Sequence, residues 1–141
     1  MKVYIAGPMS GIPAFNIPAF DAAAWCLRQL DLEVVSPAEL DGEWIRKRLS
    51  ASKAGSLEDY PVGHTWGDFL SRDVKLLADG DIEAVVVISG WEKSRGARLE
   101  TFVAYALCGM PVYRFDGTTE LKKVSEFDLI VAWGGGSNEP D

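Results

Sequence analysis

Apolar side chains recur along the chain with two different spacings, and their alternation predicts a mixed α/β fold. Residues 82–88 are rich in valine, which is typical of a strand buried on both faces of a parallel sheet. Residues 16–30 instead place apolar side chains three and four positions apart, as one face of a helix does. The same reasoning predicts strands at residues 2–6, 33–35, 82–88, 110–115 and 129–133, and helices at residues 16–30, 38–49, 65–78, 96–107 and 118–126.

Strands that alternate with helices pair in parallel through right-handed crossovers. We therefore expect a three-layer, doubly wound sheet of about five parallel strands, in the Rossmann-like or flavodoxin-like class. The chain has 141 residues, nearly half of them apolar, and we expect residues 1–133 to form a single domain. Glycine, serine and proline in residues 50–63 predict an irregular insertion, and the composition of residues 134–141 predicts a disordered tail.

Composition and charge narrow the classes of partner. A formal net charge of −7 argues against nucleic acid, since the 14 lysines and arginines form no basic stripe. No stretch approaches the roughly 20 apolar residues of a membrane span, and the start of the chain lacks the layout of a signal peptide. Cys26 and Cys108 fall in expected helices among apolar neighbours, so we expect reduced core thiols and a cytoplasmic protein. The single histidine, His64, argues against a histidine-built metal site.

Three loops follow the first three expected strands: residues 7–11, 36–37 and 89–95. Ligands bind at the carboxyl ends of strands in open α/β sheets, and glycine lets backbone N–H groups approach a ligand closely. The loops match neither the dinucleotide-binding nor the Walker pattern, and each alone could be a turn that merely needs glycine. Their shared edge favours a binding site, and we expect the substrate to contact Gly7, Pro8, Met9, Ser10, Gly90, Trp91, Ser94, Gly96 and Ala97.

Three further side chains could carry chemistry at this edge. Glu100 lies four residues after Gly96, where the helix dipole stabilises an anion by about 0.3 to 1 kcal/mol, so we expect an ionised carboxylate able to attack carbon. Asp73 shares the apolar face of its helix and could supply a proton, although a structural salt bridge near Arg72 would also explain it. Tyr4 could direct its hydroxyl into the cleft. A surface role for Glu100 and a core role for Tyr4 are the plainer alternatives.

The chain resembles a known family at these positions. Residues 4–11 (Tyr-Ile-Ala-Gly-Pro-Met-Ser-Gly), Arg72-Asp73 and residues 90–100 (Gly-Trp-x-x-Ser-Arg-Gly-Ala-x-x-Glu) look like the nucleoside 2-deoxyribosyltransferase superfamily. The similarity covers roughly residues 1–113 and is greater to an often phage-encoded branch, the DUF4406 domain family. This resemblance implies that Glu100 attacks C1′ of a deoxynucleoside, with Asp73 as a substrate-orienting or proton-transferring group and Tyr4 near the sugar. In the related deoxynucleoside monophosphate N-glycosidases, Ser94 and Gly96 would match phosphate-contacting positions.

We therefore expect an enzyme that cleaves or transfers the N-glycosidic bond of a nucleoside, a deoxynucleoside or a 5′-monophosphate, with no metal or cofactor. The phosphohydrolase branch usually carries serine and arginine where this chain has Pro8 and Ser10, which removes polar contacts, and Arg95 and Arg98 could compensate. One alternative is a protein of the same fold that binds or sequesters a nucleotide without turning it over, and another is a Rossmann-like interaction domain with no ligand. Superfamily members often form oligomers, so the resemblance also implies a homodimer or a larger homo-oligomer.

Overall fold

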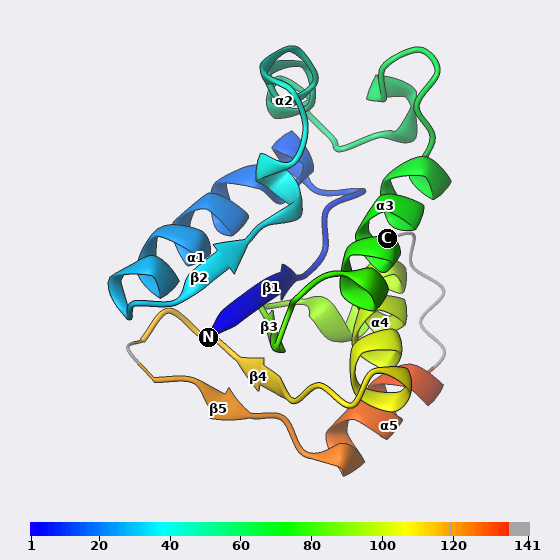
Figure 1. The fold of residues 1–141 in the computed structure, drawn as a ribbon. Helices are drawn as coiled ribbons and strands as arrows, with labels where there is room; N and C mark the ends of the chain where they lie inside the picture. Colours follow the sequence, from blue (N-terminus) through cyan, green and yellow to red (C-terminus); the bar gives the residue numbers. More distant parts are fainter. Residues whose placement is uncertain (119, 136–141) are drawn as a thin grey trace.

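A five-stranded mixed sheet lies at the centre of the molecule. A computed structural model of the chain describes residues 1–118 and 120–135. The strands follow the order β2-β1-β3-β4-β5, and the three pairs formed by β1 to β4 are parallel, whereas β4 and β5 are antiparallel (Figure 1). The strands are β1 (Lys2–Ala6), β2 (Glu33–Val35), β3 (Ala84–Val87), β4 (Val112–Arg114) and β5 (Lys122–Lys123). The expected sheet of parallel strands is therefore correct for four strands and wrong for the fifth.

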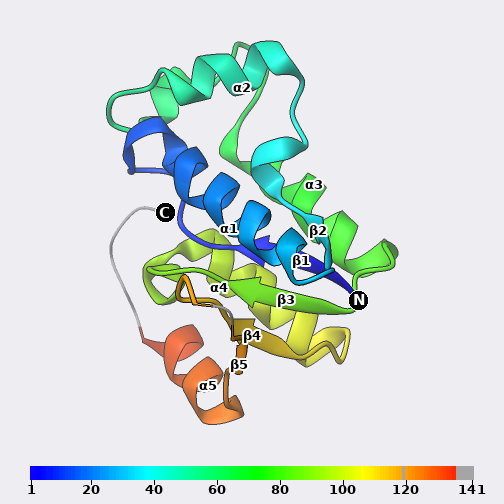
Figure 2. The ribbon, with the colours of Figure 1, turned by 90° about the vertical axis from the view of Figure 1, so that its left-hand side faces the viewer.

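Helices cover both faces of the sheet. Alternate residues of β1 face opposite sides: Val3 and Ile5 pack with α1, whereas Tyr4 and Ala6 pack with α3, α4 and α5. Figures 1 and 2 show α1 on one face and α3 and α4 on the other. The helices are α1 (Ile17–Gln29), α2 (Glu43–Ser50), α3 (Trp66–Asp79), α4 (Arg95–Phe102) and α5 (Glu126–Gly134).

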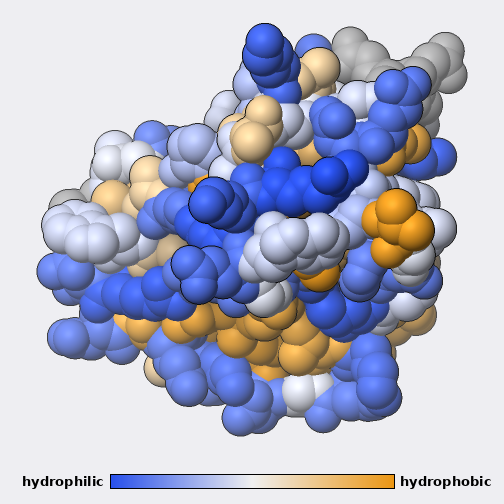
Figure 3. Space-filling view, turned by 90° about the horizontal axis from the view of Figure 1, so that it is seen from above, coloured by the Kyte–Doolittle hydropathy of each residue, from blue (hydrophilic) through white to orange (hydrophobic). Residues whose placement is uncertain are grey.

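The parallel strands end at the edge above which α2 and the insertion lie (Figure 1). The helix expected at residues 38–49 is divided into a 3-10 turn, Pro37–Glu39, and α2, because Gly42 has an extended backbone where α2 begins. The insertion contains one 3-10 turn, Leu57–Asp59. Seen from this end, the surface is largely hydrophilic with scattered apolar patches (Figure 3).

The insertion is docked on the loop that follows β1. The N–H of Gly11 donates to the carbonyl of Gly55 at 2.8 Å, and the N–H of Ala14 donates to the carbonyl of Ser52 at 2.7 Å. Gly55 has a φ of +65°, and a Cβ there would lie 2.2 Å from the carbonyl oxygen of Ile12, so only glycine fits. Residues 52–55 are therefore a fixed part of this end of the molecule.

The first loop also contains an unusual backbone turn. Ala14, Phe15 and Asn16 have φ values of 57°, 51° and 59°, in the left-handed region that costs most residues energy. The turn buries the Phe15 ring, and the Asn16 side-chain amide donates to the carbonyl of Pro8 at 2.8 Å. The strained backbone thus directs an aromatic ring inward beside the insertion.

The C-terminal elements differ from the prediction. The helix expected at residues 118–126 is wrong, since β5 lies there, and the strand expected at residues 129–133 is wrong, since α5 occupies it. Ser125 accepts a hydrogen bond from the N–H of Asp128, and the carboxylates of Glu126 and Asp128 lie in the first turn, where the helix dipole favours them. A short apolar run is compatible with a helix or a strand, and these capping residues favour the helix.

Smaller differences concern the end of α4, the cysteines and the tail. The helix expected at residues 96–107 continues from α4 into a π-helical turn, Val103–Leu107, before Gly109 at a φ of +70°. Both cysteines are free thiols, but Cys108 is exposed rather than in the core. Gly134 closes α5, and residues 136–141 of the expected tail lie outside the described residues. Within the described residues, no helix is both long and apolar enough to cross a membrane.

Candidate active site

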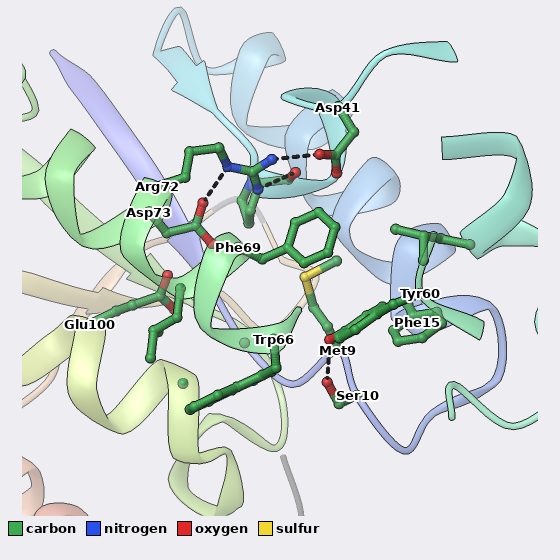
Figure 4. Close-up of a pocket in the computed structure, with 15 residues that line it drawn as sticks. Met9, Ser10, Phe15, Asp41, Tyr60, Trp66, Phe69, Arg72, Asp73 and Glu100 are labelled. Carbon is green, nitrogen blue, oxygen red and sulfur yellow. Dashed lines mark hydrogen bonds and ion pairs between the residues drawn. The ribbon is translucent and has the colours of Figure 1, made fainter. Parts of the chain in front are cut away.

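A cavity lies at the carboxyl ends of β1 and β2, between α3, α4 and the docked insertion (Figure 4). It is partly open to solvent, and its volume is about 60 Å³. Two kinds of side chain line it on separate sides, which we call the carboxylate wall and the aromatic wall. The carboxylate wall consists of Asp41, Arg72, Asp73 and Glu100, and the aromatic wall consists of Phe15, Tyr60, Trp66 and Phe69.

Glu100 reaches the cavity from α4. Ser94 caps this helix by accepting a hydrogen bond from the N–H of Ala97 at 3.1 Å, which places Glu100 in the second turn. The Glu100 side chain is buried, with 5% of its residue surface exposed. The hydroxyl of Tyr4 on β1 donates to Glu100 Oε2 at 2.5 Å, so β1 fixes the orientation of this carboxylate.

Tyr4 lies beneath the carboxylate wall and joins its two central members. Its hydroxyl interacts with Asp73 as well as with Glu100. Complete burial, followed by the nearby charges of Glu100 and Asp73, raises the pKa of Tyr4 well above its ordinary value. Tyr4 therefore stays protonated and remains a hydrogen-bond donor between two carboxyl groups.

Asp73 projects from the inner face of α3. The helix begins with a capping box in which Thr65 and Asp68 exchange hydrogen bonds, and this register buries Asp73 two turns later. Burial raises the pKa of Asp73, and it outweighs the opposing effects of Arg72 and Tyr4. A carboxyl group with a raised pKa holds its proton to higher pH, which suits a proton donor.

Arg72 ties Asp73 to the loop after β2. Its Nε donates to Asp73 Oδ1 at 3.0 Å, its Nη1 donates to Asp41 Oδ1 at 2.6 Å, and its Nη2 lies 3.4 Å from the carbonyl oxygen of Pro37. The guanidinium group thus spans the carboxylate wall from α3 to the β2 loop (Figure 4). The structural salt bridge that the sequence offers as an alternative role for Asp73 is present, and Asp73 nevertheless lies in the cavity wall.

The aromatic wall is a connected set of rings. Phe15 stacks on Tyr60 with centroids 5.2 Å apart, and Tyr60 contacts Phe69 in a tilted arrangement at 5.1 Å. The hydroxyls of Tyr60 and Ser10 lie 3.0 Å apart, which links the wall to the first loop. Figure 4 shows the Met9 side chain beside the rings of Phe69 and Tyr60, with Trp66 on the side nearer Glu100.

The predicted contact residues divide into two groups. Four of them line the cavity: Gly7, Met9, Ser10 and Gly96. A Cβ on Gly7 would lie 2.4 Å from Ile88 Cγ1, so glycine lets the loop pack against the end of β3. The others, Pro8, Gly90, Trp91, Ser94 and Ala97, are not among the lining residues, and their contact with a ligand stays a prediction.

Sequence reasoning missed Asp41 and most of the aromatic wall. Asp41 follows the turn after β2, and nothing in its local sequence distinguishes it from a surface carboxylate. Tyr60, Trp66 and Phe69 cluster in the sequence at the end of the insertion and the start of α3. That concentration of aromatic residues beside a glycine-rich segment was the available signal.

The donor set does not resemble a metal centre. Across residues 1–118 and 120–135, no three His, Cys, Asp or Glu side chains cluster in a way that could hold a metal ion. Within the carboxylate wall, Arg72 occupies positions beside Asp41 and Asp73 where a cation would bind.

Comparison with known proteins places the chain in a family. No curated protein and no solved structure matches it. A family model described as a domain of unknown function, DUF4406, matches residues 1–113. The matched segment contains Tyr4, Asp73 and Glu100 together with the insertion, and it ends before β5 and α5. The chain therefore belongs to the DUF4406 family.

Proposed function

We propose that the protein cleaves or transfers the N-glycosidic bond of a nucleoside, a deoxynucleoside or a 5′-monophosphate, with Glu100 as the nucleophile. The observation that carries the proposal is the convergence of Glu100 and Asp73 on the Tyr4 hydroxyl at the rim of the cavity. A pair of carboxyl groups, one fixed for attack and one with a raised pKa, suits nucleophilic attack with proton transfer at a glycosidic bond.

The architecture supports the same proposal. The strand order β2-β1-β3-β4-β5 is that of the flavodoxin-like class, and helices on both faces favour a three-layer, doubly wound arrangement with an antiparallel edge. Ligands of such sheets bind where the strand order reverses, beyond the carboxyl ends of the strands. For this chain that point lies between β1 and β3, beside Gly7 of the cavity.

In the first step, a Glu100 carboxylate oxygen attacks C1′ of the sugar, and a C1′–O bond forms as the C1′–N bond breaks. The electron pair of the broken bond stays on the base nitrogen, and Asp73 gives the base a proton. Positive charge develops on the sugar as the base leaves, and the adjacent carboxylate stabilises it. Tyr4 holds Glu100 in place while this charge develops.

In the second step, water attacks C1′ of the glycosyl ester of Glu100. Asp73, now a carboxylate, accepts a proton from the water, and the C1′–O bond to Glu100 breaks with its electron pair returning to the carboxylate. A second base that attacks through nitrogen gives transfer instead of hydrolysis, with its proton going to Asp73. Both outcomes restore the starting protonation of the site.

Substrate entry requires side-chain movement. A cavity of about 60 Å³ has room for roughly four water molecules, which is less than a nucleoside needs. Met9 lines the cavity beside the rings of the aromatic wall, and its unbranched side chain can change rotamer at low cost. We expect Met9 to leave this position when the base enters.

The test is release of free base. The protein is incubated with the four common 2′-deoxynucleosides, the four ribonucleosides and their 5′-monophosphates, and the free base is separated by chromatography. We expect release by the wild type and at least a 1,000-fold loss in Glu100→Gln, which keeps the size and removes the anionic nucleophile. Glu92→Gln is the matched control, since Glu92 is exposed on the preceding turn.

A single-turnover sample gives a second readout. Intact-protein mass spectrometry after acid quenching should show Glu100 carrying one sugar, and the Glu100→Gln variant should show no adduct. Ligand-dependent thermal stabilisation without any base release would instead support a protein that sequesters nucleosides or nucleotides. A protein that is not stabilised by these ligands and releases no base would contradict both functions.

We further propose a homodimer or larger homo-oligomer, in the cytoplasm where nucleotides are made. The supporting feature is the exposed apolar face of α5, formed by Phe127, Ile130 and Val131. The molecular mass from small-angle scattering should be about twice the 15.4 kDa of one chain for a dimer. The Ile130→Asp substitution should lower that mass to the value for one chain. A monodisperse wild-type monomer would contradict the oligomer.

A further inference from the structure

The charges that line the cavity are unbalanced. Among the described residues that line it, three carry carboxyl groups, Asp41, Asp73 and Glu100, and one carries a cation, Arg72. The Asp41 and Asp73 side chains are 11% and 10% exposed, so salt screens them weakly. Even with the proton on Asp73 that the proposed chemistry requires, the carboxylates of Asp41 and Glu100 outnumber the one cation, so the cavity presents a net negative charge to any ligand.

Arg72 is already committed to protein oxygens. Each of its three guanidinium nitrogens faces an acceptor, on Asp73, on Asp41 and on the carbonyl of Pro37. A phosphate group would have to share this guanidinium with the carboxyl groups of Asp41 and Asp73. The ion pair with Asp41 already neutralises Arg72, and the carboxylates of Asp41 and Glu100 would repel a phosphate dianion.

Among the other anion-binding candidates, Arg98 has a buried Nε without a partner but does not line the cavity, and the rest are used within the protein. The first loop contributes no cation, and its Ser10 hydroxyl pairs with Tyr60. At the start of α4, the Ser94 hydroxyl caps the N–H of Ala97. The Arg95 guanidinium lies 4.2 Å from the centroid of the Trp66 ring and is not among the lining groups.

We propose that the cavity takes uncharged nucleosides and rejects their 5′-monophosphates, and that Asp41 determines this specificity. This inference rests on the proposed glycosidic chemistry, which assigns tasks to Asp73 and Glu100 but none to Asp41. Asp41 lies on the connection between β2 and α2 and acts on the ligand only through its charge and through Arg72. The aromatic wall completes a pocket suited to an uncharged molecule with a planar base.

The measurement is the ratio of kcat/KM for a deoxynucleoside to kcat/KM for its 5′-monophosphate. For the wild type we expect a ratio of at least about 30, because a phosphate dianion in this partly desolvated pocket meets net negative charge. In Asp41→Asn, one carboxylate becomes neutral while an amide oxygen can still accept from Arg72. We expect the ratio to fall about tenfold, mainly through faster turnover of the monophosphate.

Asp79→Asn is the matched control. Asp79 lies at the far end of α3, is exposed and pairs only with Lys75 among the contacts described, so its removal changes the net charge equally without touching the cavity. We expect this variant to keep the wild-type ratio. An equal fall in both variants would show a general charge effect and would overturn the role of Asp41.

Inorganic phosphate gives a readout that does not depend on the base. We expect millimolar phosphate to leave nucleoside turnover by the wild type unchanged and to inhibit Asp41→Asn competitively. A wild type that prefers the monophosphate, or that phosphate inhibits competitively, would overturn the inference while leaving the glycosidic function intact.

A failure of the proposed chemistry is distinguishable from a failure of this inference. If no base is released from any substrate, the glycosidic function is wrong, and thermal stabilisation by nucleoside and by monophosphate then tests the charge selection alone. Stabilisation by the nucleoside only would support the inference, whereas equal stabilisation by both, or by neither, would overturn it. The same comparison serves if Asp41→Asn unfolds.

Discussion

The two walls of the cavity are built from different kinds of structure. In the carboxylate wall, Asp73 and Glu100 lie on helices, and Tyr4 of the central strand lies beneath them. Side-chain hydrogen bonds and ion pairs hold this wall together. The aromatic wall takes most of its rings from loops and from the first turn of α3, and backbone contacts between two loops hold it. Under the proposed function, the first wall performs the chemistry and the second recognises the leaving base.

Among the substitutions compared below, Asp73→Asn in the carboxylate wall should reduce kcat/KM the most. Asparagine cannot donate the proton, so we expect kcat/KM to fall about 100-fold to 10,000-fold, in the range of general acid catalysis. Burial raises the pKa of Asp73, so in the wild type activity should decline as the pH rises through that raised value. A pH profile of kcat/KM checks both points, and an alkaline limb that persists unchanged in Asp73→Asn would contradict the assignment.

Tyr4→Phe should have the next largest effect. The variant keeps the buried ring in the core but removes the hydrogen bond to Glu100 Oε2, so the nucleophile is held less firmly. We expect a decrease in kcat of about 10-fold to 100-fold with KM nearly unchanged. Tyr105→Phe, on the far side of α4 in the π-helical turn, is the matched control. Equal activity of Tyr4→Phe and the wild type would remove Tyr4 from the mechanism.

Tyr60→Leu tests the aromatic wall with a smaller expected effect. Loss of the ring removes the stacking of Tyr60 with Phe15 and Phe69 and weakens the surface that meets the base. Base stacking on an aromatic side chain is worth about 1 to 3 kcal/mol, so we expect KM to rise about tenfold while kcat changes little. Tyr60→Phe should restore the wild-type KM. Trp44→Leu, which removes an exposed ring from α2, controls for loss of aromatic surface.

Gly55→Ala should have the smallest effect on turnover and act mainly on stability. The new Cβ would lie 2.2 Å from the carbonyl oxygen of Ile12, and the φ of +65° is unfavourable for alanine. We expect a loss of about 1 to 3 kcal/mol in the free energy of unfolding, measured by chemical denaturation. Gly42→Ala is the control, because Gly42 has a negative φ and open space around its Cα. Similar losses in both variants would mean that docking of the insertion does not depend on this contact.

The carboxylate wall was largely predictable from the sequence. Glu100 and Asp73 sit on long, periodic helices, and the ends of such elements follow from capping residues such as Ser94 and Thr65. Tyr4 follows from strand alternation, which places it on the face of the sheet opposite Val3. Local periodicity was therefore sufficient to predict that three side chains distant in the sequence lie at one edge of the sheet.

The aromatic wall and the C-terminal elements were not predictable in the same way. Phe15 faces inward because of three left-handed backbone positions, and Tyr60 reaches it because the insertion docks on the first loop. The first cause is an irregular local backbone and the second is a contact between segments about 40 residues apart, and neither leaves a periodic signal in the local sequence. The strand predicted at residues 129–133 was wrong for another reason, because an apolar run of this length fits a helix as well as a strand.

Because residues 52–55 dock on the first loop, the segment proposed to recognise the base and the spacing of the proposed catalytic groups can change independently in evolution. Ser52 and Gly55 provide the anchor, while the residues that follow them provide Tyr60 of the aromatic wall, which meets the base in the proposed function. Relatives could exchange the segment between Gly55 and Thr65 for one of another length or composition and so acquire a different base preference. The spacing of the nucleophile and the acid, which reside on α4 and α3, would survive such an exchange.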